Sequence, residues 1–324
     1  LKVMGARRNQ GLAALADVAR LDERPGAYHL GFLMGPRVNA GGRVGRSDLG
    51  ARLLTTTDPA EARTLAEELD HYNSERQAIE AVVLEEAIAQ VERQWAGAQP
   101  DPMVFAAGEG WHPGVIGIVA SRLKERYQRP TFVIALDDDQ GKGSARSISG
   151  VDLGASVTAA RQAGLLINGG GHKMAAGLTV ARGDIEALEA FLSERLAHPV
   201  AEARDGLALL LDGALTTGAV RPDLVETLER AGPYGAGNAM PRFALSSVAI
   251  RFADIVGADH VRCTLEGADG RQVKAVAFRS AATELGQLLL SGRGKRVHVA
   301  GTLRINRWNG RESAELHIED AAPA

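Results

Sequence analysis

Three consecutive glycines followed by a histidine form the most informative stretch of this 324-residue chain. The run is Gly169-Gly170-Gly171-His172, and mostly small residues come soon after it. Consecutive glycines let main-chain N–H groups turn toward one point and let a ligand approach the backbone, as in a concave anion nest. The stretch therefore predicts a bare loop that binds phosphate. A tight strand exit with a hydrogen-bonded histidine is the alternative, and the motif alone leaves both open.

Two other segments carry residue types that bind phosphate. Ser144 and Arg146 stand two residues apart in an alternating stretch, 142–147, and so share one face of a predicted strand. A hydroxyl beside a guanidinium suits a terminal phosphate. Arg37 and Arg43 stand in a glycine-rich segment whose open backbone could bring both toward one anion. A surface loop with solvated arginines is the alternative for that segment.

His112 lies at a turn that leads into a predicted apolar helix, residues 115–127. Free N–H groups and the dipole at a helix N-terminus stabilise anions, so the position suits a substrate contact. Two acidic segments are not interpreted as functional sites. The three acids at 137–139 are typical of a solvated turn, and Asp70-His71 is typical of a helix surface.

The elements that position these residues follow from periodicity. Asp58, Pro59 and Glu61 are typical of a capping-box helix start. From there to about Trp95 there is no Gly or Pro and apolar residues recur at helical spacing, which predicts a helix of roughly 50 Å between two domains. That helix is either continuous or broken once near residues 73–74.

A strand-helix-strand unit is expected after the long helix. Strands are predicted at 103–107, 130–136, 142–147 and 175–180, and helices at 115–127, 151–163 and 185–197. Pro199 is expected to end this domain.

The last third of the chain favours a small β-barrel. Five short β-type runs follow a predicted helix at 221–230, and they cover 242–253, 261–266, 272–278, 295–305 and 313–318. Trp308 stands among arginines and lysines between residues 293 and 311, a pattern typical of a groove for single-stranded nucleic acid. A solvated barrel edge is the alternative.

Composition limits the classes of protein that fit. The 37 Lys and Arg against 40 Asp and Glu give a net charge of −3, so nucleic acid must be held by local patches. A single cysteine, Cys263, excludes a disulfide framework and a cysteine-based zinc site. No membrane span or signal peptide is visible, so we expect a cytoplasmic protein of two or three domains with no membrane partner.

Five motifs occur in series around the long helix. They read GPRVNAGGR, HPGVIG, GSARS, GGGH and GPYGAGN, and begin at residues 35, 112, 143, 169 and 232. Together they resemble the RecJ family of bacterial single-stranded-DNA-specific exonucleases, over essentially the whole chain. The resemblance implies an α/β fold in four parts: the tail of a DHH phosphoesterase domain at 1–57, a connecting helix at 58–96, a DHH-associated α/β domain at 97–200, and an OB-like β-barrel at 205–324.

The resemblance also implies a function. It implies 5′→3′ exonuclease activity in recombination and DNA repair, with Mn²⁺ or Mg²⁺ ions that activate water and clamp the scissile phosphate. Ser144 and Arg146 would hold the 5′ phosphate, and Gly169–His172 would line the cleft. Arg37 and Arg43 would reach phosphates from the first domain, and the barrel would grip the strand. Single-stranded DNA, single-strand-binding protein and repair helicases are the implied partners.

This sequence departs from the family pattern at the metal site. No Asp-His-His string occurs, and the nearest string, Asp70-His71-Tyr72, lies on the connecting helix. We expect the metal-binding segment to precede Leu1, so no catalytic residue and no metal ligand is assigned in this chain. The chain is then expected to bind DNA and to cleave it poorly or not at all.

Two alternative functions stay open at this stage. One is a non-catalytic module that binds single-stranded nucleic acid. The other is a DHH phosphodiesterase for short oligonucleotides or cyclic dinucleotides. A barrel with Trp308 favours a longer strand, because small substrates need no distal grip.

Overall fold

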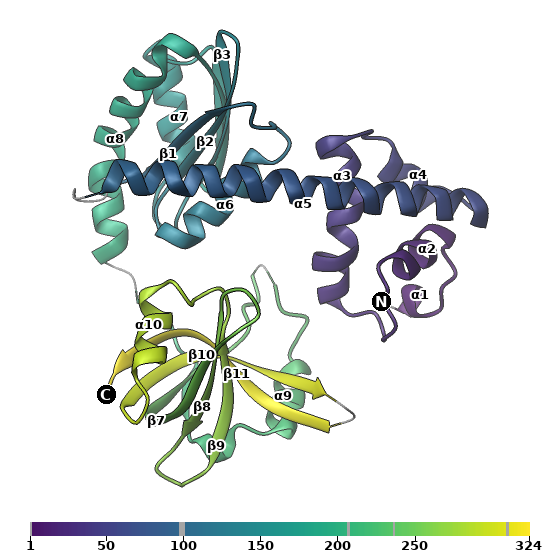
Figure 1. Ribbon diagram of the computed structural model, residues 1–324, viewed down its shortest axis with the longest axis vertical. Helices are drawn as coiled ribbons and strands as arrows, with labels where there is room; N and C mark the ends of the chain where they lie inside the picture. The colour runs from purple at the N-terminus through teal and green to yellow at the C-terminus, as the bar shows by residue number, and fades with distance from the viewer. Residues whose placement is uncertain (1, 97–100, 206–207, 236, 309–310) are drawn as a thin grey trace. The chain divides into compact units, whose positions relative to one another are not determined.

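The computed structural model describes residues 2–96, 101–205, 208–235, 237–308 and 311–324 (Figure 1). The chain divides into two compact units, residues 1–207 and 208–324. Residues 97–100, which open the predicted DHH-associated domain, lie outside the described residues. Within the described residues, no helix combines the length and the apolar character that a membrane crossing requires.

The first unit begins with short helices packed on the first half of a long one. Asn9 caps α2 by accepting a hydrogen bond from the Leu12 N–H, and Asp58 caps α5 in the same way through the Ala60 N–H. The segment that was expected to be an open glycine-rich backbone is helical. The elements are α1 (Lys2–Gly5), α2 (Gln10–Val18), the π-helix η1 (His29–Met34), α3 (Gly35–Val44), α4 (Leu49–Thr55) and α5 (Pro59–Trp95).

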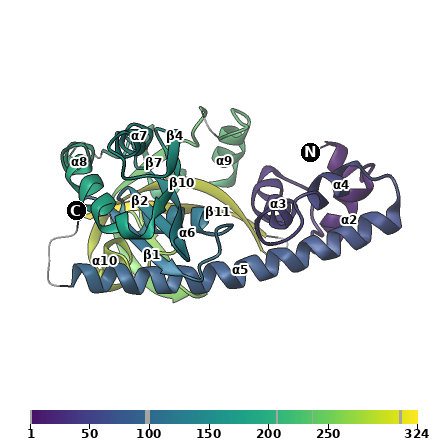
Figure 2. The same cartoon turned by 90° about the horizontal axis from the view of Figure 1, so that it is seen from above.

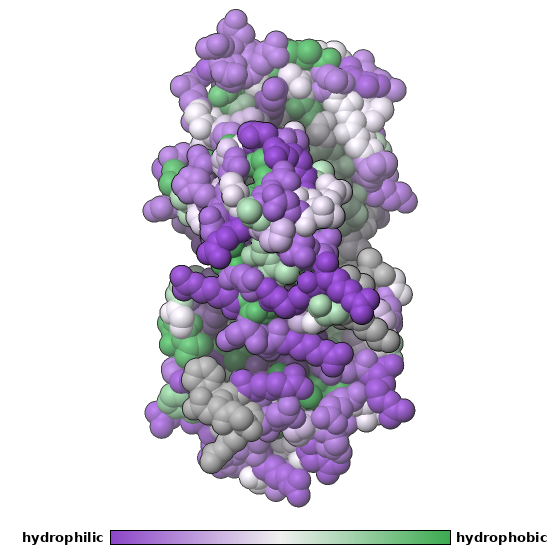
Figure 3. Space-filling model, turned by 90° about the vertical axis from the view of Figure 1, so that its right-hand side faces the viewer, coloured by the Kyte–Doolittle hydropathy of each residue, from purple (hydrophilic) through white to green (hydrophobic). Residues whose placement is uncertain are grey.

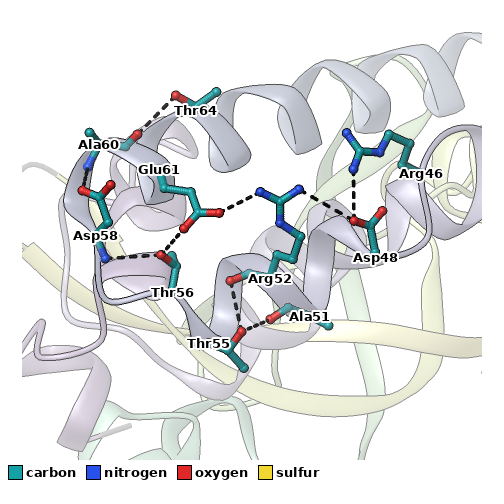
Figure 4. A network of polar contacts seen from close by, with 10 residues as sticks. All are labelled: Arg46, Asp48, Ala51, Arg52, Thr55, Thr56, Asp58, Ala60, Glu61 and Thr64. Carbon is teal, nitrogen blue, oxygen red and sulfur yellow. Dashed lines mark hydrogen bonds and ion pairs between the residues drawn. The ribbon is translucent and has the colours of Figure 1, made fainter.

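A polar network fixes the turn between α4 and α5 (Figure 4). Arg52 on α4 bridges Asp48 and Glu61, and Glu61 also accepts a hydrogen bond of 2.6 Å from Thr56 Oγ1. These contacts, the Thr56 hydrogen bond first, lower the pKa of Glu61 below its ordinary value. Glu61 therefore holds the preceding helix, whereas the capping-box pattern alone suggests a bond back to the cap residue.

Helix α5 is continuous over its 37 residues, with no break at 73–74. Its buried face serves two cores in turn: Leu65 and Leu69 pack with the N-terminal helices, and Val83 and Val91 pack against the sheet of the same unit. Figure 2 shows α2 to α4 along one end of α5, and α6 and β1 along the other. The predicted connecting helix thus packs into the hydrophobic cores of both halves of the first unit.

A five-stranded sheet forms the second half of this unit, in the order β1-β2-β3-β5-β4. Phe132 and Ile134 of β2 face the core under α7 and α8, whereas Val133 and Ala135 face the core under α5 and α6. The alternation follows from the two-residue period of a strand. The elements are β1 (Val104–Glu109), α6 (Ile116–Tyr127), β2 (Thr131–Asp137), β3 (Gln140–Arg146), α7 (Leu153–Gln162), β4 (Asn168–His172), β5 (Ala175–Ala181), the 3-10 turn η2 (Arg182–Asp184) and α8 (Ile185–Asp205).

The predicted strand-helix-strand unit is present, because β1 and β2 pair in parallel and α6 connects them. The expected end at Pro199 is wrong: α8 contains Pro199 and continues to Asp205. Leu196 and Val200 on either side of Pro199 are buried against the sheet, so packing stabilises the helix through this position.

The second unit is a closed five-stranded β-barrel, as the sequence predicts. Strand β10 pairs with β7 and closes the barrel, and the short β6 adds to β7 in parallel. Helix α10 was not predicted; Thr283 caps it by accepting from the Gly286 N–H. The elements are β6 (Gly213–Leu215), η3 (Thr217–Ala219), α9 (Pro222–Glu229), β7 (Arg242–Val256), β8 (His260–Glu266), β9 (Gln272–Ala277), α10 (Glu284–Ser291), β10 (Arg296–Trp308) and β11 (Arg311–Pro323).

Hydrophilic side chains predominate on the face shown in Figure 3, and hydrophobic ones form smaller patches there. The most exposed large apolar side chains among the described residues include the stacked pair Tyr28 and Phe32 on and beside η1. Scattered apolar residues of this kind are normal on protein surfaces.

Candidate nucleic-acid interface

A groove of about 720 Å³ opens on the sheet of the first unit, beside the start of α6. Its lining includes three cations, Arg43, Lys142 and Arg146, and no Asp or Glu among the described residues. Seven of its sixteen lining residues are glycines, so much of its wall is bare backbone. Cations without carboxylate neighbours on such a wall favour an anionic ligand.

Ser144 and Arg146 lie side by side in this groove, as the two-residue spacing predicts. Arg146 Nη1 donates to Ser144 Oγ at 3.1 Å and to the Ala145 carbonyl oxygen at 2.8 Å. The start of α6 packs directly on the pair: a Cβ atom on Gly117 would lie 2.9 Å from Arg146 Nη2 and 3.1 Å from Ser144 Oγ. Glycine at this position therefore lets a helix N-terminus approach the guanidinium and the hydroxyl together.

The electrostatics of the pair favour an incoming negative charge. Burial and then the charge of Arg43 lower the pKa of Arg146 from its ordinary value. Arg43 Nη1 donates to the Gly114 carbonyl oxygen at 3.2 Å, which ties the end of α3 to the turn before α6. Among the described residues that line the groove there is no carboxylate to neutralise these two guanidinium groups, and an anion between them would offset both the desolvation and the repulsion.

The glycine run is a strand and not the predicted loop. Residues Asn168–His172 form β4, the edge strand of the sheet, paired with β5 in regular antiparallel register. An extended strand does not turn successive N–H groups toward one point, so this stretch does not form the expected anion nest. Gly170 faces the groove, where an added Cβ would meet nothing within 4 Å, whereas Gly171 has room for no side chain against Ala175 and Ala176. Glycine here provides a flat floor and close packing.

Four predicted site residues of the first unit do not line the groove, namely Arg37, His112, Gly171 and His172. Arg37 pairs with Asp70 at 2.7 Å and does not line the groove, because six positions on a helix of 3.6 residues per turn put it on a different side of α3 from Arg43. His112 Nδ1 accepts from the Gly114 N–H at 3.0 Å and holds the turn. His172 lies in register with Ala175, two strands from Arg146, and is outside the lining.

The side chain of Trp308 falls outside the described part of the structure, so its proposed contact with a strand stays a prediction.

The sequence interpretation did not name eleven of the sixteen lining residues as site residues, among them Gly117, Lys142, Asn168 and Thr179. The alternation that placed Ser144 and Arg146 on one face places Lys142 there too, so that signal was available. Asn168 and Thr179 join the groove through strand pairing between β3, β5 and β4, which local sequence does not encode.

The described residues contain no group of three or more His, Cys, Asp or Glu side chains that could hold a metal ion. Among the described residues there is thus no such donor set for the Mn²⁺ or Mg²⁺ ions that the family pattern implies.

Two family models match parts of this chain. Residues 101–198 match the family model of the DHHA1 domain, and residues 211–320 match that of the RecJ OB domain. The single-stranded-DNA-specific exonuclease RecJ of Bacillus subtilis is 34% identical over 297 residues, which are 90% of this chain and 36% of that protein. The Escherichia coli protein of the same name is 31% identical over 99% of this chain and 56% of its own length.

A solved structure gives the same result for the fold. The crystal structure of RecJ from Thermus thermophilus in complex with Mn²⁺ superposes with a TM-score of 0.79 at 29% identity, over 100% of this chain and 45% of that one. The chain thus spans about half the length, or less, of the relatives it matches. With the motifs, both domain models and the fold in agreement, the chain belongs to the RecJ family and carries its DHHA1 and OB domains.

Proposed function

We propose that the groove binds the 5′-phosphorylated end of single-stranded DNA, and that this chain is the substrate-binding portion of a 5′→3′ exonuclease of recombination and DNA repair. The observation that carries the proposal is the pair Ser144 and Arg146, packed under the start of α6 in a groove lined by cations and glycines with no acid among its described residues. The relatives named as single-stranded-DNA-specific exonucleases support it.

Each part of the groove has a role in this proposal. The Arg146 guanidinium and the Ser144 hydroxyl donate to the terminal phosphate oxygens, and Arg43 contributes a second positive charge. A terminal phosphate carries about −1.5 to −2 charges at pH 7, whereas a 5′ hydroxyl carries none, so the site should discriminate strongly between the two ends. The flat Gly170 and Gly177 floor lets the sugar approach the backbone.

In this proposal, hydrolysis requires metal ions in addition to the residues of the groove. Mn²⁺ or Mg²⁺ would supply an activated water and charge stabilisation at the scissile phosphate. In the proposal, the residues of this chain bind and orient the strand and are not the metal ligands.

The second unit supports a long substrate. A closed barrel that matches the RecJ OB domain suits a strand that extends beyond its 5′ end. Single-strand-binding protein and repair helicases remain proposed partners on the strength of the family alone.

Binding of 5′-phosphorylated and 5′-hydroxyl single strands, each labelled at the 3′ end, tests the proposal by fluorescence anisotropy. The chain should prefer the phosphorylated end, and Arg146→Ala should abolish that preference at a cost of about 1.5–3 kcal/mol, or roughly 10- to 150-fold in affinity. Arg182→Ala is the matched control, because Arg182 pairs with Glu109 and does not line the groove. An unchanged preference in Arg146→Ala would contradict the proposal.

The alternatives make different predictions. A phosphodiesterase for dinucleotides should bind them as tightly after truncation at residue 205, whereas a long-strand enzyme should lose affinity for long strands far more than for dinucleotides. Cyclic dinucleotides have no terminal phosphate and should bind weakly under our proposal. A stand-alone binding module should bind single strands with no preference for the 5′ phosphate.

A further inference from the structure

The face of the sheet that carries Ser144 and Arg146 continues across two more strands. Strands β3, β5 and β4 pair in register, so side chains on this face form three rows across them. The rows are Arg146–Ala175–His172, Ser144–Gly177–Gly170 and Lys142–Thr179–Asn168.

This face is covered at one end and open at the other. The core under α5 and α6 contains described residues of β1 and β2, such as Val133 and Ala135, and none of β4 or β5. In the middle row, a Cβ on Gly177 would meet no atom closer than 4.0 Å and one on Gly170 none within 4 Å. The groove therefore extends from the Arg146 pair over a flat, open floor toward the third row.

The third row is polar and electropositive. Lys142, Thr179 and Asn168 all line the groove, and among the described residues Lys142 has no carboxylate within ion-pair distance. Asn168 Oδ1 already accepts from the Gly169 N–H at 2.9 Å, which leaves its amide nitrogen to donate. An ammonium, a hydroxyl and an amide donor in a groove without acids suit an anion rather than a cation.

This row lies on the far side of Ser144 from Arg146. Lys142 is four residues from Arg146 along β3, so their Cα atoms are about 13 Å apart at the rise of a strand. We propose that Lys142, Thr179 and Asn168 form a second phosphate subsite, which binds an internal phosphodiester of the strand whose 5′ end lies at Arg146. The inference rests on the proposed function. It adds that the groove binds two phosphates of the same strand, with the nucleotides between them lying over Gly170 and Gly177.

The consequence is a dependence on substrate length. A nucleoside 5′-monophosphate reaches only the Arg146 end, so its affinity is independent of Lys142. A 5′-phosphorylated oligonucleotide also reaches the third row, so its affinity includes the Lys142 contact. Loss of one cation–phosphate contact should reduce the magnitude of the salt slope, log K against log salt concentration, by about 0.7 for a single strand.

The test compares a nucleoside 5′-monophosphate with 5′-phosphorylated oligonucleotides of increasing length, by calorimetry on the full chain at several salt concentrations. Lys142→Ala should weaken the oligonucleotides about two- to fivefold, reduce the magnitude of their salt slope and leave the monophosphate unchanged. Lys124→Ala on α6 is the control, because Lys124 lies outside the groove lining. Unfolding temperatures confirm that each variant is folded.

Three results would overturn the inference. If Lys142→Ala leaves the affinity for oligonucleotides unchanged, the third row is not a phosphate subsite. If it lowers the affinity for the monophosphate equally, Lys142 contacts the same phosphate as Arg146. A loss that depends on base identity and not on length would make the row a base contact. In all three, Arg146-dependent binding of the monophosphate persists, whereas a wild-type chain that binds neither ligand would refute the proposed function itself.

Discussion

Gly117 offers a way to disturb phosphate binding without the removal of any binding side chain. In Gly117→Ala, the new methyl carbon would lie 2.9 Å from Arg146 Nη2 and 3.1 Å from Ser144 Oγ, and the first distance is one that real Cβ atoms essentially never show. The atom in the way is the far end of a flexible side chain, so Arg146 should move and the fold should persist. Alanine is better than glycine inside a helix by roughly 0.5–1 kcal/mol, so stability should stay equal or rise.

Gly117→Ala should instead lower the affinity for the phosphorylated strand. A displaced guanidinium loses a charge-assisted hydrogen bond to the phosphate, which is worth about 1.5–3 kcal/mol, or roughly 10- to 150-fold in affinity. Anisotropy with 5′-phosphorylated and 5′-hydroxyl strands measures this loss, and the unfolding temperature measures stability. We expect weaker binding of the phosphorylated strand in a variant whose unfolding temperature is unchanged or higher.

Two comparisons make this prediction refutable. Ser121→Ala alters the same helix, where Ser121 Oγ donates to the Gly117 carbonyl oxygen, without any added bulk near Arg146 and should bind normally. In the Arg146→Ala background, Gly117→Ala should cause no further loss of affinity for the phosphorylated strand, because the guanidinium that it displaces is already absent. Normal phosphate binding in Gly117→Ala, or costs that simply add in the double variant, would refute the proposed contact.

Other predictions concern stability and chemistry. Glu80 is buried between Arg76 and Arg122, so Glu80→Ala should lower the free energy of unfolding by about 3–5 kcal/mol in urea, and a loss under 1 kcal/mol would contradict this. Burial raises the pKa of the Cys263 thiol to about 12, so thiol reagents should modify it only at the rate at which the barrel opens; fast labelling of the native chain would contradict its burial. Burial, then neighbouring acids, raises the pKa of Glu189, so unfolding free energy should fall as pH rises from the ordinary carboxyl value through the raised one; Glu189→Gln should therefore raise the unfolding temperature at neutral pH but not at acidic pH. With Mn²⁺ and labelled single strands, this chain should release few or no nucleotides, and robust release would show that it holds a complete metal site.

Local signals predicted most of the helices and strands. Asp58 and Pro59 mark the start of α5, and the absence of Gly and Pro up to Trp95 marks its length, because capping and propensity act over a few residues. Two local signals misled. Pro199 lies inside α8, where packing outweighs the proline, and Gly35–Val44 is a helix in spite of its glycines because tertiary contacts of α3 override propensity.

The site was predictable in part. A two-residue period is enough to place Ser144 and Arg146 together, and the structure confirms that geometry. The glycine run was interpreted as a loop, because three glycines carry no propensity for a strand and only pairing with β5 makes them one. The approach of Gly117 to Arg146 depends on how α6 crosses the sheet, which no local pattern encodes.

The central claim is that the groove between α6 and β3 holds the 5′ phosphate of a single strand. A crystal structure of this chain with a 5′-phosphorylated oligonucleotide tests it most directly. We predict the terminal phosphate within hydrogen-bond distance of Ser144 Oγ and the Arg146 guanidinium, with the strand leading over Gly170 toward Lys142. A strand bound with its 5′ phosphate elsewhere, and the Arg146 guanidinium free of it, would contradict the account.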